Sequence, residues 1–145
     1  MYNKENRSGH RAISGFRESP FCSMASLSRK EHFIMDKIKK NFGFGCMRLP
    51  MKDGEVDKEQ MCKMVDTFLE QGFNYFDTAH GYLDGKSELA LRDCLTSRHD
   101  RSKYILTNKL TNIYFKSEEE IRPFFESQLK ACGVDYFDFY LMHAQ

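Results

Sequence analysis

The alternation of short apolar strands with amphipathic helices is the feature that most constrains how this chain can fold. Each predicted strand after the first also ends on an ionisable residue. The predicted strands after the first one end at Asp77, Lys109 and His143, which stand 32 and 34 residues apart. Such an interval is the length of one strand–helix–strand unit. The order βαβαβαβ predicts parallel strands joined by right-handed helical crossovers.

Capping residues mark where the helices begin and end. Asp57 and Gln60 stand in capping-box positions, which predicts a helix that starts there. The last helix has two candidate starts, because Ser117 with Glu120 forms a second capping box while Pro123 favours a start nearer the proline. We expect strands over residues 41–46, 73–77, 104–109 and 136–143, and helices over residues 57–72, 87–95 and 117–132.

This repeat fits either a doubly wound sheet or successive units of a (β/α)8 barrel. The first strand carries only Gly43-Phe44-Gly45, a G-x-G without the rest of a dinucleotide fingerprint, which favours the barrel. Alternate residues of a strand share one face, so mostly apolar series end at Asp77, Lys109 and His143. On neighbouring strands these three side chains are expected to cluster, and Tyr82 lies in a loop able to fold over them. A purely structural Asp77–Lys109 ion pair is the plainer alternative.

Three segments carry a resemblance to a known family. Residues 76–82 (FDTAHGY), 106–109 (LTNK) and 138–143 (DFYLMH) resemble the aldo/keto reductases, as does the opening GFGCMRLP of residues 43–50. The resemblance runs from about Asn41 to Gln145. It is closest to a bacterial branch that often adds a C-terminal iron–sulfur tail, and these 145 residues show no such tail.

The resemblance implies a (β/α)8 barrel that uses NADPH or NADH to reduce a small-molecule carbonyl to an alcohol. It also implies a catalytic tetrad of Asp77, Tyr82, Lys109 and His143. Tyr82 would donate the proton, Lys109 would make the phenol a better acid, Asp77 would hold the ammonium, and His143 would bind the substrate oxygen. The residues implied to lie near the cofactor are Gly45, Cys46, Met47 and Asp77.

Two other functions remain open from the sequence. The barrel could serve as a nucleotide-binding regulatory module without useful turnover, or the chain could be an inactive fragment, because fold and motif do not fix function. A metal-dependent barrel hydrolase would need paired histidine ligands near the first strand, and the sequence has none there. We therefore expect no metal.

Composition narrows the partners and the compartment. The formal net charge is +1 and no long apolar run occurs, so we expect neither nucleic acid nor a membrane as partner. The oligomeric state is left open. The five cysteines are an odd number without close spacing, which is typical of reduced thiols in a cytoplasmic protein.

The chain divides at Met35. Residues 1–34 are rich in Ser, Arg and Gly without apolar periodicity, and we interpret them as a disordered or spurious extension, with Met35 as the natural start. Residues 35–145 would form the N-terminal part of the barrel, comprising three βα units and a fourth strand. We expect this piece alone to be an unstable enzyme with open edge strands and exposed aromatic rings at Phe124, Phe125, Phe137 and Phe139.

Overall fold

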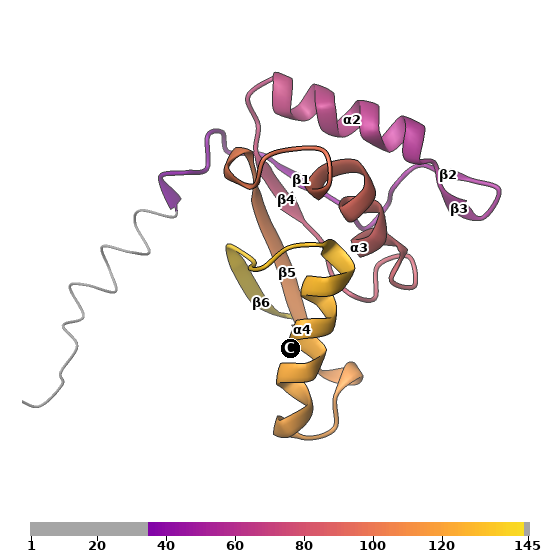
Figure 1. Ribbon diagram of the computed structural model, residues 1–145, viewed down its shortest axis with the longest axis vertical. Helices are drawn as coiled ribbons and strands as arrows, with labels where there is room; N and C mark the ends of the chain where they lie inside the picture. Colours follow the sequence, from indigo (N-terminus) through magenta and orange to yellow (C-terminus); the bar gives the residue numbers. More distant parts are fainter. Residues whose placement is uncertain (1–34, 144–145) are drawn as a thin grey trace, which may run out of the picture.

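The computed structural model describes residues 35–143, in which a four-stranded parallel sheet is covered by helices on one face (Figure 1). The strand order is β1-β4-β5-β6, and every neighbouring pair is parallel. The expected parallel order is therefore confirmed. The strands are β1 (Gly43–Gly45), β4 (Tyr75–Asp77), β5 (Ile105–Thr111) and β6 (Phe139–His143), and the helices are α2 (Lys58–Glu70), α3 (Lys86–Leu91) and α4 (Ile121–Cys132).

The helix boundaries follow from their caps. The Asp57 carboxylate accepts a hydrogen bond from the Gln60 backbone N–H at 3.0 Å and opens α2 as expected. A 3-10 turn over Glu118–Glu120 precedes α4, so the helix starts at Ile121 with Pro123 in its first turn. The capping-box start at Ser117 is wrong and the proline-based start is confirmed. Helix α3 is shorter than expected and continues as a π-helical turn, Arg92–Thr96.

A small hairpin between β1 and α2 was not predicted. Strands β2 (Met51–Lys52) and β3 (Glu55–Val56) pair antiparallel and are joined by Asp53 and Gly54. Both joining residues have positive φ, 52° and 81°, which is the conformation that a tight Asp-Gly hairpin turn requires. The dipeptide was the signal in the sequence for this hairpin.

The hydrophobic core lies between the sheet and the helices. Phe76 and Leu106 point from β4 and β5 to this side, where they meet Met61 and Val65 of α2 in one buried cluster. The ring of Phe68 packs against Phe76 at 5.2 Å between centroids. Because strand residues alternate between faces, the neighbours of Phe76 and Leu106 point away from the helices.

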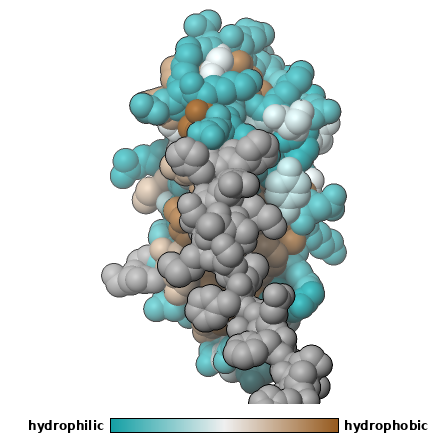
Figure 2. Space-filling view, turned by 90° about the vertical axis from the view of Figure 1, so that its left-hand side faces the viewer, coloured by the Kyte–Doolittle hydropathy of each residue, from teal (hydrophilic) through white to brown (hydrophobic). Residues whose placement is uncertain are grey.

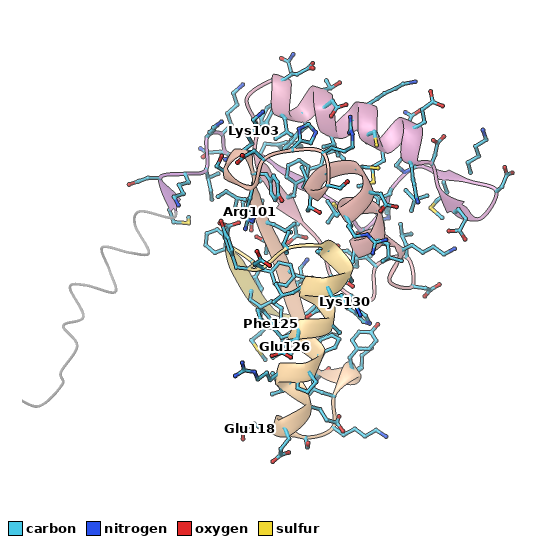
Figure 3. All side chains as sticks on the ribbon, viewed as in Figure 1. Arg101, Lys103, Glu118, Phe125, Glu126 and Lys130 are labelled. Atoms are coloured by element: carbon cyan, nitrogen blue, oxygen red, sulfur yellow. The ribbon has the colours of Figure 1, made fainter. Side chains whose placement is uncertain are left out.

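The four phenylalanines expected to be exposed are half-buried instead. Phe125 packs edge-on against Tyr140, with 4.9 Å between ring centroids, and lies on the side of α4 toward β6 (Figure 3). Phe124 stacks on Tyr114, and Phe139 contacts Tyr75. The expectation that these four rings are exposed is wrong, because the sequence alone does not show which neighbouring side chains cover them.

The outer strands of the sheet are β1 and β6, as expected for the first and last strands of the chain. The side of the molecule in Figure 2 carries hydrophobic atoms mainly at mid-height and hydrophilic atoms at both ends. Within residues 35–143, no helix has the length and apolar character to cross a bilayer. The expectations for residues 1–34, including a start at Met35, concern sequence outside the described residues.

Candidate active site

Lys109 is the centre of a polar cluster at the carboxyl end of the sheet. Its Nζ donates to Asp77 Oδ1 at 2.6 Å and to the Thr78 carbonyl oxygen at 2.8 Å. Only 9% of the residue is exposed. A buried ammonium needs such partners to remain charged, and the carboxylate and the carbonyl supply them.

The cluster is staggered along the sheet. Asp77 pairs in register with Thr107, so Lys109 stands two positions further along β5. Lys109 in turn pairs with Leu141, two positions before His143 on β6. The sequence placed the three residues at one level, whereas here the long lysine side chain reaches back to Asp77.

Tyr82 lies in the loop that follows β4. Its backbone N–H donates to Ala79 O at 3.1 Å, and its carbonyl accepts from the Ser87 N–H at 3.3 Å, so the loop is tied at both sides of the tyrosine. The Lys109 Nζ lies 4.7 Å from the centre of the Tyr82 ring, within the range of a cation–π contact. The loop thus folds back over the lysine as expected.

His143 completes the cluster from β6. Its Nδ1 is 2.9 Å from the Thr111 hydroxyl, and its ring centroid is 5.9 Å from that of Tyr82. The Tyr82 ring therefore contacts both Lys109 and His143. All four residues of the expected tetrad meet at one end of the sheet.

The residues expected near a cofactor separate into two groups. Gly45 pairs in register with Asp77 and is exposed, and a Cβ placed on it would meet no atom within 4 Å. Met47 is also exposed, at 54%. Cys46 is fully buried in the core cluster, and burial, with the Asp77 charge adding to it, raises the pKa of its thiol well above the usual range. Its backbone is engaged too, so Cys46 presents no free group to a ligand.

A second polar network lies on the opposite, helix-covered face of the sheet, and sequence reasoning missed it. Glu88 of α3 is 1% exposed, and its two oxygens contact Asn108 Nδ2 at 2.8 Å, Gln128 Nε2 at 3.3 Å and His80 Nδ1 at 2.9 Å. The Tyr140 hydroxyl donates to Gln128 Oε1. The available signal was polar residues at core positions: Asn108 alternates with apolar strand residues, and Gln128 interrupts the apolar stripe of α4.

His80 links this network to the loop that carries Tyr82. Its ring also meets Tyr114 and Phe124 edge-on at 4.8 and 5.1 Å. His80 therefore anchors the loop that carries Tyr82 to the layer of helices. Among residues 35–143, no group of His, Cys, Asp and Glu has the arrangement of a metal site.

The profile of the aldo/keto reductase family matches residues 41–145, most of the chain. The chain belongs to that family. Solved structures of aldo/keto reductases superpose on most of this chain. The holo form of an aldo-keto reductase from Bacillus halodurans superposes with a TM-score of 0.58 at 31% identity, over 70% of this chain and 35% of that one.

Two further relatives of this aldo/keto reductase support the fold and the family. An aldo-keto reductase from Klebsiella pneumoniae in complex with NADPH superposes with a TM-score of 0.59 at 24% identity, over 71% of this chain and 34% of that one, which bears on the fold alone. The 4-dihydromethyl-trisporate dehydrogenase of Mucor mucedo is 34% identical over 106 residues, 70% of this chain and 30% of that protein. The chain thus spans about a third of the length of these relatives. The four parallel strands are half of the (β/α)8 barrel that its structural neighbours form.

Proposed function

We propose that this chain carries the proton-transfer half of an NAD(P)H-dependent carbonyl reductase, with Asp77, Tyr82, Lys109 and His143 as catalytic residues. The observation that carries the proposal is the Lys109 ammonium, held by Asp77 and placed against the Tyr82 ring. A structural ion pair alone gives no reason for a tyrosine and a histidine to converge on the same lysine.

Tyr82 is the proton donor in this proposal. Reduction of a carbonyl leaves negative charge on oxygen, and a proton must reach that oxygen. A phenol is a weak acid, and a cation beside it favours the phenolate form. The Lys109 Nζ lies 4.7 Å from the centre of the Tyr82 ring, so its positive charge would stabilise the negative charge that develops on the tyrosine as the proton leaves.

Asp77 keeps the lysine in place. Its carboxylate at 2.6 Å neutralises the ammonium and fixes it together with the Thr78 carbonyl. The side chain of Asp77 is itself 29% exposed, so water can hydrate its negative charge and keep the carboxylate ionised. Asp77 thus orients the cation without consuming the proton.

His143 orients the substrate. Because its Nδ1 faces the Thr111 hydroxyl, its Nε2 is the nitrogen left to meet a carbonyl oxygen. A donor at that position would stabilise the negative charge that develops on the oxygen. The substrate class that follows is an aldehyde or ketone.

The described residues fit a nicotinamide cofactor. The open space beside Gly45 lies next to Asp77 and allows a flat ring to approach the backbone. Gly45, Met47 and Asp77 would border that ring, while Cys46 would hold the loop from behind. When bound, NADPH or NADH supplies the hydride.

The free thiols of Cys46, Cys62, Cys94 and Cys132 support a cytoplasmic location for this protein.

The test is the oxidation of NADPH with a generic aldehyde, measured in a complete barrel that contains residues 41–145. Tyr82→Phe keeps the ring and removes the proton donor, so turnover should fall by about 10²–10⁴-fold. Tyr75→Phe is the matched control, because it removes a phenol bonded to Thr107 on the same face of the sheet. Near-full activity of Tyr82→Phe would show that the tetrad assignment is wrong, whereas no turnover by the unchanged barrel would favour a binding module.

A further inference from the structure

Two cysteines, Cys62 and Cys94, face the same turn of α2 in the helical layer, away from the candidate active site. Cys62 belongs to α2 and Cys94 to the π-helical turn after α3. Burial, together with the hydrogen bond between the two thiols, raises the pKa of Cys94 to about 12. The Cys94 Sγ also lies 3.5 Å from the Lys58 carbonyl oxygen. Side chains of a helix lean toward its N-terminus, so Cys62 covers this same turn of α2.

Ion pairs hold the two segments together on both sides of the thiols. One turn before Cys62, the Lys58 ammonium pairs with Asp93 at 2.6 Å. One turn after it, Asp66 pairs with Arg98 at 2.7 Å. These two ion pairs therefore hold α2 and the π-helical turn together on both sides of the cysteines.

The two thiols differ in access. Cys62 is half-buried, while Cys94 is fully buried at 0% exposure. The Arg98 guanidinium donates to the Cys94 carbonyl oxygen at 3.0 Å, and its charge acts on both thiols. An oxidant from solvent therefore meets Cys62 first, with Cys94 directly behind it.

We propose that Cys62 and Cys94 form a reversible disulfide in response to hydrogen peroxide, with Cys62 as the peroxide-reactive thiol and Cys94 as the resolving thiol. The Cys62 thiol gives up its proton, its thiolate attacks a peroxide oxygen and the O–O bond breaks; the hydroxide that leaves takes up that proton, so sulfenic acid and water result. The Cys94 sulfur then attacks the Cys62 sulfur, and the S–O bond breaks. The released hydroxide takes the Cys94 proton, so two electrons pass from the dithiol to the peroxide and two waters form.

Formation of the bond needs a short approach, because a disulfide requires a sulfur–sulfur distance of about 2.05 Å. Both thiols lie at the turn of α2 that begins at Lys58, and the bridge would join α2 to the extension of α3. Exchange with an external dithiol would restore both thiols. The modification therefore acts on the packing of two helices and leaves the tetrad side chains unmodified.

The test uses the full chain with Cys22, which lies outside the described residues, replaced by Ser in every sample. The protein is treated with equimolar hydrogen peroxide, blocked with N-ethylmaleimide, and digested with trypsin without reduction. We expect the peptides of residues 59–63 and 93–98 to be linked, lighter together by two hydrogens, and to separate after dithiothreitol. The peptides that hold Cys46 and Cys132 should carry only the maleimide.

Two single variants assign the roles. In Cys94→Ser the reaction should stop at Cys62 sulfenic acid, which dimedone traps, and in Cys62→Ser the Cys94 thiol should remain free. Cys94→Ala is made alongside, because Cys94 is fully buried, and circular dichroism selects the variant that folds. A first disulfide between other cysteines, or oxidation of Cys94 at an unchanged rate in Cys62→Ser, would overturn the proposal.

Discussion

Asn108 and Lys109 are consecutive residues of β5, and they serve the two faces of the sheet in opposite ways. On the helix-covered face, Asn108 donates to Glu88, and both side chains are fully buried. On the other face, Lys109 pairs with Asp77, a carboxylate that is 29% exposed. The carboxylate of the first pair is 1% exposed, whereas the carboxylate of the second pair lies partly open, where a ligand could reach it.

The difference teaches that a buried polar residue is not by itself evidence of chemistry. Glu88 is more deeply buried than any tetrad residue, yet amide groups, a histidine and helix packing occupy its surroundings. The Lys109 cluster is distinguished by a partly exposed carboxylate and by the Tyr82 ring against the lysine. Substitutions on the two faces should therefore separate activity from stability.

The largest effect is expected at Lys109. Lys109→Met removes the cation beside Tyr82 with little change of length, so turnover in a complete barrel should fall by about 10²–10⁴-fold. The double variant with Asp77→Asn should lose far less than the product of the two separate losses, because the pair acts as one unit. Steady-state oxidation of NADPH measures both. Fully multiplicative losses would argue against a coupled pair.

The covered face should respond in stability instead. Glu88→Ala removes buried side-chain volume and the carboxylate that accepts from the Asn108 amide, while Gln128 keeps its bonds to Asn108 Oδ1 and the Lys109 carbonyl. An unsatisfied buried group costs about 1–3 kcal/mol, and the cavity adds to that loss. We expect a loss of about 3 kcal/mol in the free energy of unfolding, measured by urea denaturation. Glu88→Gln should retain more of the stability. The control is Leu89→Ala, an exposed neighbour, and an equal loss there would contradict the structural role of Glu88.

His143 should give a milder and substrate-dependent effect. His143→Gln keeps a hydrogen-bond donor but changes its position, so turnover should fall by about tenfold or less, with a spread among aldehydes and ketones. A panel of carbonyl substrates at fixed NADPH measures the spread. A uniform loss as large as that of Tyr82→Phe would mean that the histidine takes part in proton transfer.

The smallest effect concerns pH and lies away from both networks. The hydrogen bond from Arg98 holds the pKa of Asp66 below its ordinary value. The folded pKa is depressed, so the stabilisation is present above the unfolded pKa of about 3.9 and is lost as the pH falls through the folded value. Because Asp66 is about a third exposed, we expect Asp66→Asn to cost only about 0.5 kcal/mol at neutral pH and less at acid pH.

Urea titrations at a series of pH values measure this difference for Asp66→Asn. Glu59→Gln, which removes an exposed pair with Lys63, is the control and should leave the curve unchanged. A loss that persists undiminished at pH below the folded pKa would show that the carboxylate acts through packing.

The sequence was most informative where a local rule applies. The cap at Asp57, the parallel order of the strands and the convergence of Tyr82 with Lys109 all follow from periodicity and the family resemblance. Contacts between distant residues were beyond it: nothing local joins Glu88 to Gln128 across 40 positions, and nothing shows that Tyr75 covers Phe139. The instability expected of residues 35–145 alone remains a prediction.

The stagger of the tetrad has a consequence for insertions and deletions. Asp77, Lys109 and His143 are placed by register, each two positions beyond the partner of the one before. One residue removed from β5 before Asn108 would turn Lys109 into the helical layer and Asn108 toward the open face. Removal of two residues would leave Lys109 on the open face of the sheet but move it two residue positions along the strand. Insertions or deletions of an odd number of residues in β5 should therefore abolish function. Only those of an even number could retain it.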